Sequence, residues 1–331
     1  MKKFFALMLA VLMMLSLAAC ADPGAGGEDD GPKDIYVIIK AMGNAYWSVL
    51  QAGAEKAGVD LGCNVTVVGI PNEADIEAQL TLLQNAVSSG ADAIIIAVAD
   101  SESQAEAVSE AYQSGIPIVM VDTKAKTDDY SAALLTDNVK AGEMAAEELI
   151  KNLKKTHTDT DAVQVAIQIG STGSQTIISR MEGFEAYWAA NAPATWELLL
   201  DDIKVNDGDI PKAITLAHDF LTSYPNLSGF FSPNNGSTVG FATALVEANR
   251  TDIAMVGFDF SPEMEEIVRN PEFNVSTMLQ NQYFMGYDGV KIALDLANGG
   301  AEPSPKDIDT GVLAVNIDNV DSDDVKAATG K

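Results

Sequence analysis

Short apolar runs rich in β-branched residues alternate with longer helical stretches from residue 35 to residue 297, and this alternation restricts the fold more than any other feature. Strands this short and apolar, separated by helices, are typical of parallel sheets covered on both faces. The predicted strands are Ile35–Ile39, Val65–Val68, Ala93–Ala97, Ile118–Val121, Ala133–Thr136, Val163–Ile169, Glu197–Leu200, Gly229–Ser232, Ile253–Phe258 and Val275–Leu279.

The stretches between these runs carry helix-forming residues, with apolar side chains at spacings of three and four. The predicted helices are Trp47–Leu61, Asp75–Ser88, Glu102–Ser114, Ala141–Lys154, Ile177–Ala190, Pro211–Ser223, Val239–Ala248, Glu263–Val268 and Phe284–Ala297. The pattern predicts an α/β fold, and ten strands divided five and five indicate two similar doubly wound lobes with parallel sheets.

The first twenty residues differ from the rest of the chain. Two lysines precede the apolar run Phe4–Ala19, which is shorter than the roughly 20 residues that a membrane-spanning helix needs. This pattern predicts a secretory signal peptide over residues 1–19. The segment Leu17-Ala18-Ala19-Cys20 looks like a bacterial lipobox, whose cysteine is acylated, although an ordinary signal cut at the same place is the alternative. The Gly-, Pro- and acid-rich residues 20–33 predict a flexible tether.

The chain is strongly acidic, with a formal net charge of −28 that becomes −30 when the two leader lysines are removed. No basic cluster offsets this charge, so the chain would be repelled by phosphate backbones and we expect no nucleic-acid partner. The acids are scattered over predicted helix surfaces, which favours a role in solubility. If Cys20 carries lipid, Cys63 has no disulfide partner, and we expect it to be a small buried hydrophobe.

Polar and aromatic residues follow the carboxyl ends of many of the predicted strands. In parallel α/β sheets, ligands bind outside this edge. The candidate binding residues are Lys40, Asn44, Tyr46 and Trp47 after the first strand, Asp122 and Thr123 after the fourth, Arg180 beyond the turn that follows the sixth, Asn234 after the eighth, Asp259 after the ninth and Gln280 after the tenth.

This set combines carboxylates, cations, amides and an aromatic pair. Planar carboxylate, amide and guanidinium groups can each bond two neighbouring hydroxyls, and aromatic faces pack against the C–H face of a sugar ring. Each residue alone has an ordinary structural explanation, such as a turn cap for Asp122 or Asn234, core packing for Trp47 or a surface ion pair for Arg180. Their joint position at strand ends instead predicts a carbohydrate-binding cleft.

The sequence offers no convincing catalytic or metal-binding constellation. His157 and His218 neighbour no candidate nucleophile, and neither HExxH nor a paired CxxC occurs. The turn 170–173 resembles a phosphate cradle but lacks the Walker lysine. Asp122 and Asp259 could be imagined as paired glycosidase carboxylates, but the nearby cations are expected to hold both ionised. We therefore predict no enzyme activity, no cofactor and no metal.

The motifs at the strand ends resemble those of ribose- and allose-type sugar-binding proteins of ABC transporters, which have the type I periplasmic binding fold. The resemblance spans residues 34–318 and rests on the order and spacing of several motifs. They are Asn44-Ala45-Tyr46-Trp47, Ile118–Asp122, Thr136-Asp137-Asn138, Arg180–Phe184, Asn234 and Val256–Asp259. The resemblance implies that Tyr46 and Trp47 stack on the sugar. It also implies that its hydroxyls or ring oxygen are bonded by Asn44, Asp122, Arg180, Asn234, Asp259 and Gln280.

The resemblance further implies an extracytoplasmic solute-binding protein that closes two lobes on a sugar and presents it to the permease of an ABC importer. Hinge crossings are expected near residues 136–138, 280–281 and 309–311. The N-terminal lobe would then comprise residues 34–136 and 281–309, and the C-terminal lobe residues 137–280 and 310–331.

We expect a monomer whose only hold on the membrane is the lipid at Cys20, on the periplasmic side or the outer cell surface. A LacI-type effector domain would need a helix-turn-helix where the leader stands. A sensor that hands its ligand to a membrane receptor remains an alternative, as does a polyol or a furanose-like autoinducer as ligand.

The chain also departs from the ribose-type pattern. Thr123 replaces an arginine, Gly208 lies where an aromatic wall is usual, and Lys40 occupies a position that is small and polar in ribose binders. The two candidate cations and two candidate aspartates cancel in charge, and unpaired buried charge is costly, so we predict a neutral monosaccharide. The small size of Thr123 and Gly208 predicts room for an aldohexose ahead of ribose.

Overall fold

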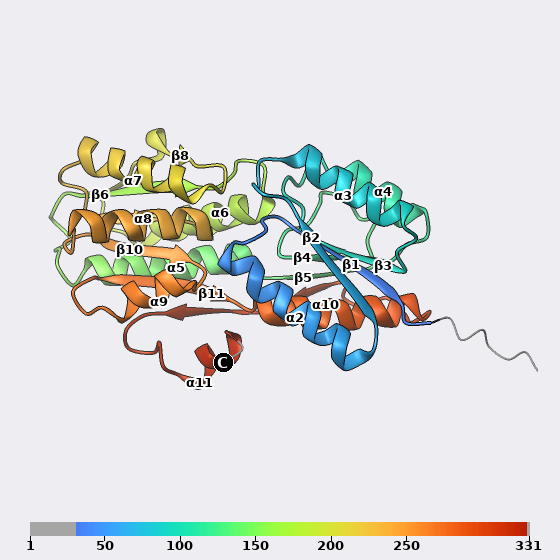
Figure 1. The fold of residues 1–331 in the computed structure, drawn as a ribbon. Coiled ribbons are helices and arrows are strands. Elements are labelled where there is room, and N and C mark those ends of the chain that lie inside the picture. The colour runs from blue at the N-terminus through green and yellow to red at the C-terminus, as the bar shows by residue number, and fades with distance from the viewer. Residues whose placement is uncertain (1–30, 330–331) are drawn as a thin grey trace, which may run out of the picture. The chain divides into compact units, whose positions relative to one another are not determined.

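Two separate sheets organise residues 31–329, the part of the chain that the computed structural model describes (Figure 1). The first sheet has the strand order β12-β5-β4-β3-β1-β2, and the second has the order β13-β11-β10-β9-β6-β7, with β8 also paired to β6. We call the sheets with their helices lobe 1 and lobe 2. The predicted signal peptide, Cys20 and most of the predicted tether lie outside the described residues.

Lobe 1 is built mainly from the first part of the chain. Its elements are β1 (Asp34–Ile39), α2 (Ala45–Leu61), β2 (Asn64–Gly69), α3 (Ile76–Ser88), β3 (Ala93–Ile96), α4 (Ala105–Gln113), β4 (Ile118–Val121), β5 (Ala132–Leu135), α10 (Gln282–Ala297) and β12 (Asp307–Asp309). All strand pairs in its sheet are parallel.

Lobe 2 contains the middle of the chain and the C-terminal segment. Its elements are α5 (Asn138–Leu153), β6 (Val163–Ile169), α6 (Gln175–Asn191), β7 (Trp196–Leu198), a 3-10 turn (Leu200–Asp202), β8 (Lys204–Val205), α7 (Ile210–Ser223), β9 (Gly229–Phe231), α8 (Asn235–Ala248), β10 (Ala254–Phe258), α9 (Pro262–Arg269), β11 (Val275–Gln280), β13 (Val312–Val315) and α11 (Asp323–Ala328). Its strands are parallel except for β13, which pairs antiparallel with β11.

Each sheet is covered by helices on both faces, which explains why its central strands, such as β3 and β4, are apolar. In β3, Ile95 packs with α2 and α10, whereas Ile94 and Ile96 pack with α3 and α4 on the other face. Figure 1 shows α3 and α4 on one side of the lobe 1 sheet and α2 and α10 on the other. Successive strand residues point to opposite faces, so a strand covered twice has no position that favours a polar side chain.

A close helix pair occurs at the same place in each lobe. A Cβ atom at Gly286 of α10 would lie 2.0 Å from the backbone oxygen of Leu50 in α2. A Cβ atom at Gly142 of α5 would lie 2.1 Å from the backbone oxygen of Arg180 in α6. Only glycine allows two helix backbones to approach this closely. The second contact also fixes the position of a predicted binding residue.

The chain passes between the lobes at three places, after β5, after β11 and after β12. The crossing segments are bonded to one another. The amide of Thr310 donates to the backbone oxygen of Leu135 at 2.7 Å, the side chain of Asn281 donates to the oxygen of Thr310 at 3.3 Å, and the amide of Asp137 donates to Asp309 at 3.1 Å. The three segments therefore form one bonded bundle.

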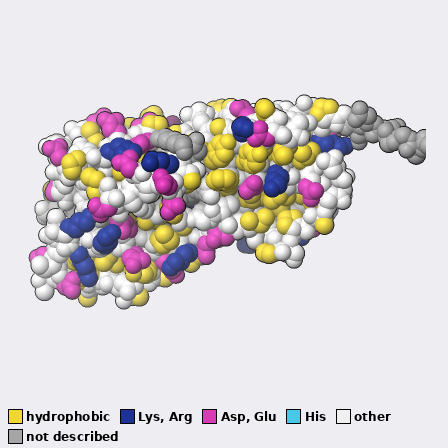
Figure 2. Space-filling view, turned by 90° about the horizontal axis from the view of Figure 1, so that it is seen from below, with side chains coloured by type: hydrophobic (Ala, Val, Ile, Leu, Met, Phe, Trp, Pro, Cys, Tyr) yellow, Lys and Arg dark blue, Asp and Glu magenta, His cyan; other side chains and the backbone are white. Residues whose placement is uncertain are grey.

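The predicted two-lobed α/β fold is confirmed, and differences occur at its edges. The strands β8, β12 and β13 and the helix α11 were not predicted, and Leu200 lies in a 3-10 turn instead of a strand. Cys63 is buried, as expected. Among residues 31–329, no helix is long and apolar enough to cross a membrane. On the face seen in Figure 2, basic side chains lie among acidic ones and form no separate block.

Candidate ligand-binding site

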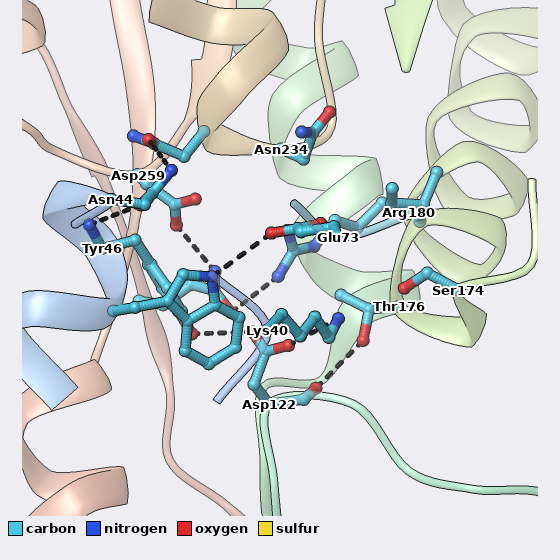
Figure 3. Close-up of a pocket in the computed structure, with 14 residues that line it drawn as sticks. Lys40, Asn44, Tyr46, Glu73, Asp122, Ser174, Thr176, Arg180, Asn234 and Asp259 are labelled. Atoms are coloured by element: carbon cyan, nitrogen blue, oxygen red, sulfur yellow. Dashed lines mark hydrogen bonds and ion pairs between the residues drawn. The ribbon is translucent and has the colours of Figure 1, made fainter. Parts of the chain in front are cut away.

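A cavity lies where the carboxyl ends of the strands of both sheets face each other (Figure 3). Its empty volume, which includes space open to solvent, is about 370 Å³. The lining residues are Lys40, Asn44, Tyr46, Trp47, Glu73, Asp122, Ser174, Thr176, Ile177, Arg180, Asn234, Asn235, Asp259 and Gln280.

Asp122 is the centre of the lobe 1 side. The Tyr46 hydroxyl donates to its Oδ1 at 2.7 Å, and the Thr123 hydroxyl donates to its Oδ2 at 2.6 Å. The Nζ of Lys40 lies 3.2 Å from the same Oδ2 and donates to the Thr123 oxygen at 2.6 Å. All four side chains are at least nine-tenths buried. The aromatic pair stands beside them, with the ring of Trp47 set edge-on to that of Tyr46 at 4.8 Å between centroids.

Arg180 and Gln280 form the lobe 2 side. The guanidinium donates to Asn138 at 2.9 Å, to the backbone oxygen of Pro233 at 2.7 Å and to Oε1 of Gln280 at 2.6 Å. It also stacks 4.0 Å over the ring of Phe258. The Gln280 amide nitrogen then donates to Oδ1 of Asp259 at 2.7 Å. The second cation of the cavity is therefore held by neutral acceptors and not by a direct ion pair.

The two aspartates occupy matching positions in the two lobes. Asp122 follows the last residue of β4 and Asp259 follows the last residue of β10. Both have left-handed backbones, with φ of 60° and 73°. Non-glycine residues seldom adopt this conformation, which costs on the order of 1–3 kcal/mol, and it is found most often at ligand sites.

The two carboxylates have opposite electrostatic environments. Burial alone would raise the pKa of Asp122, but the charges of Lys40 and Arg180 and the two hydroxyl hydrogen bonds together hold it below its ordinary value. Burial raises the pKa of Asp259 from 3.8 to about 7, and the attraction of Arg180 and the bond from Gln280 offset this only in part. The expectation that nearby cations hold both aspartates ionised is therefore wrong for Asp259, because no cation contacts its carboxylate directly.

The lobes touch each other around the cavity. Thr176 of α6 donates to the backbone oxygen of Asp122 at 2.9 Å, and its hydroxyl lies 2.7 Å from that of Thr123. Asn44 donates to Asn235 at 3.0 Å. Since each of these contacts joins lobe 1 to lobe 2, the structure is a closed form in which both lobes contribute walls to one site.

Nine of the ten predicted binding residues line this cavity, and Thr123 is the exception. Thr123 is completely buried behind Lys40 and Asp122, where it positions their polar atoms. Sequence reasoning missed five lining residues, namely Glu73, Ser174, Thr176, Ile177 and Asn235. Asn235 directly follows the predicted residue Asn234, Ser174 lies in the turn between β6 and α6, and Glu73 follows β2, one of several strands after which no binding residue was predicted.

The predicted room for a larger sugar is not provided in the way we expected. Thr123 does not face the cavity, so its small size opens no space there. The space beside Gly208 is occupied from the opposite lobe, because a Cβ atom on Gly208 would lie 3.1 Å from both Cβ and Cγ of Glu73. The size argument for an aldohexose over ribose therefore loses both of its supports.

The arrangement supplies hydrogen-bond donors and acceptors from both lobes and one aromatic wall. In the part of the chain that the structure covers, no group of three or more His, Cys, Asp or Glu residues could hold a metal ion. A compact molecule with several hydroxyls and an apolar ring face would match the polar groups and the indole of Trp47 together.

Comparison with known proteins gives a consistent result. A family model described as "Periplasmic binding protein domain" matches residues 35–301. The chain is 27% identical to the ribose import binding protein of Salmonella typhimurium, over 90% of this chain and 94% of that protein. It superposes with a TM-score of 0.84 on a carbohydrate transporter solute-binding protein of Agrobacterium radiobacter in complex with D-arabinose, at 28% identity and 90% and 99% coverage of the two chains. It superposes with a TM-score of 0.81 on an ABC transporter solute-binding protein of Agrobacterium vitis with bound D-fucose, at 28% identity and 88% and 98% coverage.

Proposed function

Because the chain belongs to the periplasmic binding protein family, we propose that it captures a neutral monosaccharide between its two lobes and delivers it to an ABC importer. The observation that carries this proposal is the cavity at the facing strand ends, where buried hydrogen-bonding groups from both lobes stand beside an aromatic pair. The sugars named for the similar proteins, ribose, D-arabinose and D-fucose, are all neutral monosaccharides. The named relatives are transport proteins and not enzymes, which fits a chain whose site binds its ligand without reaction.

In this proposal the lining residues divide into two roles. Trp47, with Tyr46 set edge-on against it, packs against the C–H face of the sugar ring. The polar groups that bond hydroxyls or the ring oxygen are Lys40, Asn44, Asp122, Arg180, Asn234, Asp259 and Gln280. Thr123 acts indirectly, by holding Lys40 beside Asp122.

We propose the lobe boundaries that the sequence predicts, with residues 34–136 and 281–309 in one lobe and 137–280 and 310–331 in the other. The membership of β5 and β12 in one sheet and of β11 and β13 in the other supports these boundaries. The bonded bundle of three crossing segments would be the hinge on which the lobes open and close.

Family membership implies a location outside the cytoplasm. We further propose that Cys20 carries a lipid and that residues 20–33 tether the binding unit to the membrane surface. The lipobox-like residues before Cys20 and the Gly- and acid-rich composition that follows support this. A dozen extended residues reach about 40 Å, which is enough to keep the lobes free of the membrane. The binding unit would act as a monomer that meets the permease subunits of the importer.

The proposal is tested by titration calorimetry and thermal unfolding with D-ribose, D-arabinose, D-fucose, D-allose, D-galactose, D-glucose and inositol. A cognate sugar present at 100 times its dissociation constant should stabilise the protein by about 2.7 kcal/mol. If no sugar in the panel binds or stabilises the protein, the proposed function is wrong. Tightest binding of inositol would place a polyol ahead of the monosaccharides.

A further inference from the structure

Glu73 places a third carboxylate at the cavity. It lies in the loop between β2 and α3, and its Oε1 accepts a hydrogen bond of 3.3 Å from the indole nitrogen of Trp47. Figure 3 shows its carboxylate directed at that nitrogen, among the side chains that line the cavity. The side chain is half-buried. Its carboxylate is therefore close to the site but not neutralised by an ion pair there.

The position of Glu73 depends on a gap in the opposite lobe. Gly208 has a left-handed backbone with φ of 74° and no side chain, and the stem of Glu73 passes beside it. A Cβ atom on Gly208 would approach Cβ, Cγ and Cδ of Glu73 to 3.1–3.3 Å. When the lobes are closed, this contact brings Glu73 against the wall of lobe 2, so the same carboxylate faces a ligand enclosed between them.

The cations of the cavity have protein partners, although each keeps N–H donors for a ligand. The Nζ of Lys40 contacts Asp122 and Thr123, and Arg180 donates to Asn138, Pro233 and Gln280. Asp259 and Glu73 each accept a single hydrogen bond, from Gln280 and Trp47, and have acceptor capacity left for a ligand.

With Glu73 included, three carboxyl groups face two cations in the cavity, a formal excess of one negative charge that is complete only above the raised pKa of Asp259. The two carboxylates also affect each other, because the charge of Glu73 is one of the influences that raise the pKa of Asp259. The remaining influences on that carboxyl are its burial, Arg180, Gln280 and Asp122. Since charges enclosed in a protein are poorly screened, a charge on the ligand would be felt strongly by this pair.

We propose that Glu73 is a further specificity-determining residue, which makes the cavity rank sugar derivatives by charge. An ammonium group in place of a hydroxyl is accepted at least as well as the neutral sugar, and a carboxylate or phosphate is rejected. This inference rests on the proposed function and deepens it, because it extends the class of ligands to amino sugars.

The test compares the native chain with Glu73→Gln by calorimetry at one pH and low salt. The probes are D-galactose, D-galactosamine and D-galacturonate, together with D-glucose, D-glucosamine and D-glucuronate. In the native protein we expect each amino sugar to bind at least as tightly as its neutral parent, and each acid to bind at least about tenfold more weakly. In Glu73→Gln, we expect the amino-to-neutral affinity ratio to fall about threefold or more, and the penalty on the acids to shrink.

The substitution separates charge from structure, because the carbonyl oxygen of glutamine still accepts the indole N–H of Trp47. A residue that only orients Trp47 would change all affinities together and leave the ratios unaltered. The matched control is Glu77→Gln, in the first turn of α3, where the side chain is exposed and does not line the cavity. Its ratios should equal those of the native protein.

The inference is overturned if Glu73→Gln has the native amino-to-neutral and acid-to-neutral ratios. It is also overturned if D-ribose or D-arabinose binds but none of the six hexose derivatives does, because its ligand class would then not enter the site. The same holds if only D-fucose or D-allose binds, whereas the proposed function itself fails if no sugar of its own panel binds.

Discussion

Asp122 and Asp259 show how residues at matching positions acquire different chemistry. Both follow a strand end in a left-handed conformation, yet only Asp122 is bonded by a lysine and two hydroxyls. Asp259 is bonded by one amide, and the effect of burial on its pKa is therefore offset only in part. A ligand that donates hydroxyl hydrogens to Asp259 would supply what the protein leaves out.

The raised pKa of Asp259 makes folding stability depend on pH. A carboxyl whose pKa rises from 3.8 unfolded to about 7 folded binds its proton more tightly in the native state. The native state then holds more protons than the unfolded chain between these values, so this group's stabilisation is lost as pH rises to 7. We expect the free energy of unfolding of the native chain, minus that of Asp259→Asn, to fall by on the order of 1 kcal/mol per pH unit between pH 5 and 7.

The measurement is urea unfolding of both proteins at several pH values. Taking the difference between their free energies of unfolding removes the contribution of the other titrating acids, which both proteins share. Asp122→Asn is the control, for which the same difference in the free energy of unfolding should change with pH in the opposite direction. The pKa of Asp122 is lowered in the folded state, so the stability that this carboxylate contributes is present above its ordinary pKa and is lost as the pH falls. A flat difference for Asp259→Asn from pH 5 to 8 would show that this carboxyl titrates normally.

Arg180 is the single side chain that ties most of lobe 2's polar wall together. In Arg180→Ala, Pro233 and Asn138 would lose their donors and Gln280 would lose one of its two. Each unpaired buried group costs roughly 1–3 kcal/mol, so we expect sugar affinity to fall about 100-fold or more. Calorimetry measures the loss. Arg269→Ala, which removes an arginine that bonds Glu265 and Asp321 on the surface, should bind normally. Near-native affinity of Arg180→Ala would place the ligand elsewhere.

Most residues that line the cavity could be predicted from the sequence because they follow the carboxyl ends of strands. Side chains converge at these ends even where the predicted strand bounds are off by a residue. The residues that were missed depend on tertiary contact. Thr176 reaches the site by crossing from α6 to Asp122 in the other lobe, and Glu73 reaches it through the gap at Gly208. The charge environment of Asp259 was likewise beyond prediction, because it depends on which acceptors Arg180 selects in three dimensions.

At the scale of elements, the apolar central strands were predictable, whereas the short strands β8 and β12 were not. Asp307–Asp309 is a strand only because it lies beside β5, and Lys204–Val205 only because it lies beside β6. Neither segment has an apolar run of its own. The central strands differ because their burial on two faces requires an apolar sequence, which is visible without the fold.

The close helix pair in lobe 2 gives a test of how packing positions the site. In Gly142→Ala, the new methyl would collide with the backbone oxygen of Arg180, so α5 and α6 must move apart. We expect a loss of about 1–3 kcal/mol of stability from overpacking, together with weaker sugar binding because Arg180 shifts. Thermal unfolding and calorimetry measure the two effects. Gly58→Ala, whose methyl would meet Val65 at the far end of α2, should lose stability with unchanged affinity. Unchanged affinity in Gly142→Ala would mean that the helix contact does not position Arg180.

At the scale of the whole molecule, attachment and binding should be separable, because the tether precedes both lobes. We expect Cys20→Ser to lose its acyl group and move from the membrane fraction to the soluble fraction, with sugar affinity unchanged. Mass spectrometry of the mature N-terminus and fractionation check this. An unacylated native protein that fractionates as soluble would contradict the lipid anchor.

Closure of the lobes depends on a second contact, outside the cavity. The amide of Ser101 donates to the backbone oxygen of Gly173 at 3.0 Å, and the amide of Gln175 donates to the hydroxyl of Ser101 at 3.1 Å. A Cβ atom on Gly173 would lie 1.8 Å from Oδ2 of Asp100. Oδ1 of the same carboxylate accepts from Ser103 twice, at 2.8 Å each, so it cannot swing aside without losing those bonds.

Gly173→Ala should therefore hinder closure without touching the ligand. Gly173 is not among the residues with positive φ, so alanine fits its backbone and the unliganded protein should unfold at the native temperature. If the closed form becomes tenfold rarer, the apparent dissociation constant rises tenfold. We expect at least this loss in calorimetry, and a larger radius of gyration than the native protein in small-angle scattering with the same sugar. Adding Asp100→Ala removes the colliding atoms and should restore much of the affinity. Native affinity and native compaction in Gly173→Ala alone would show that the lobes do not need this contact to close.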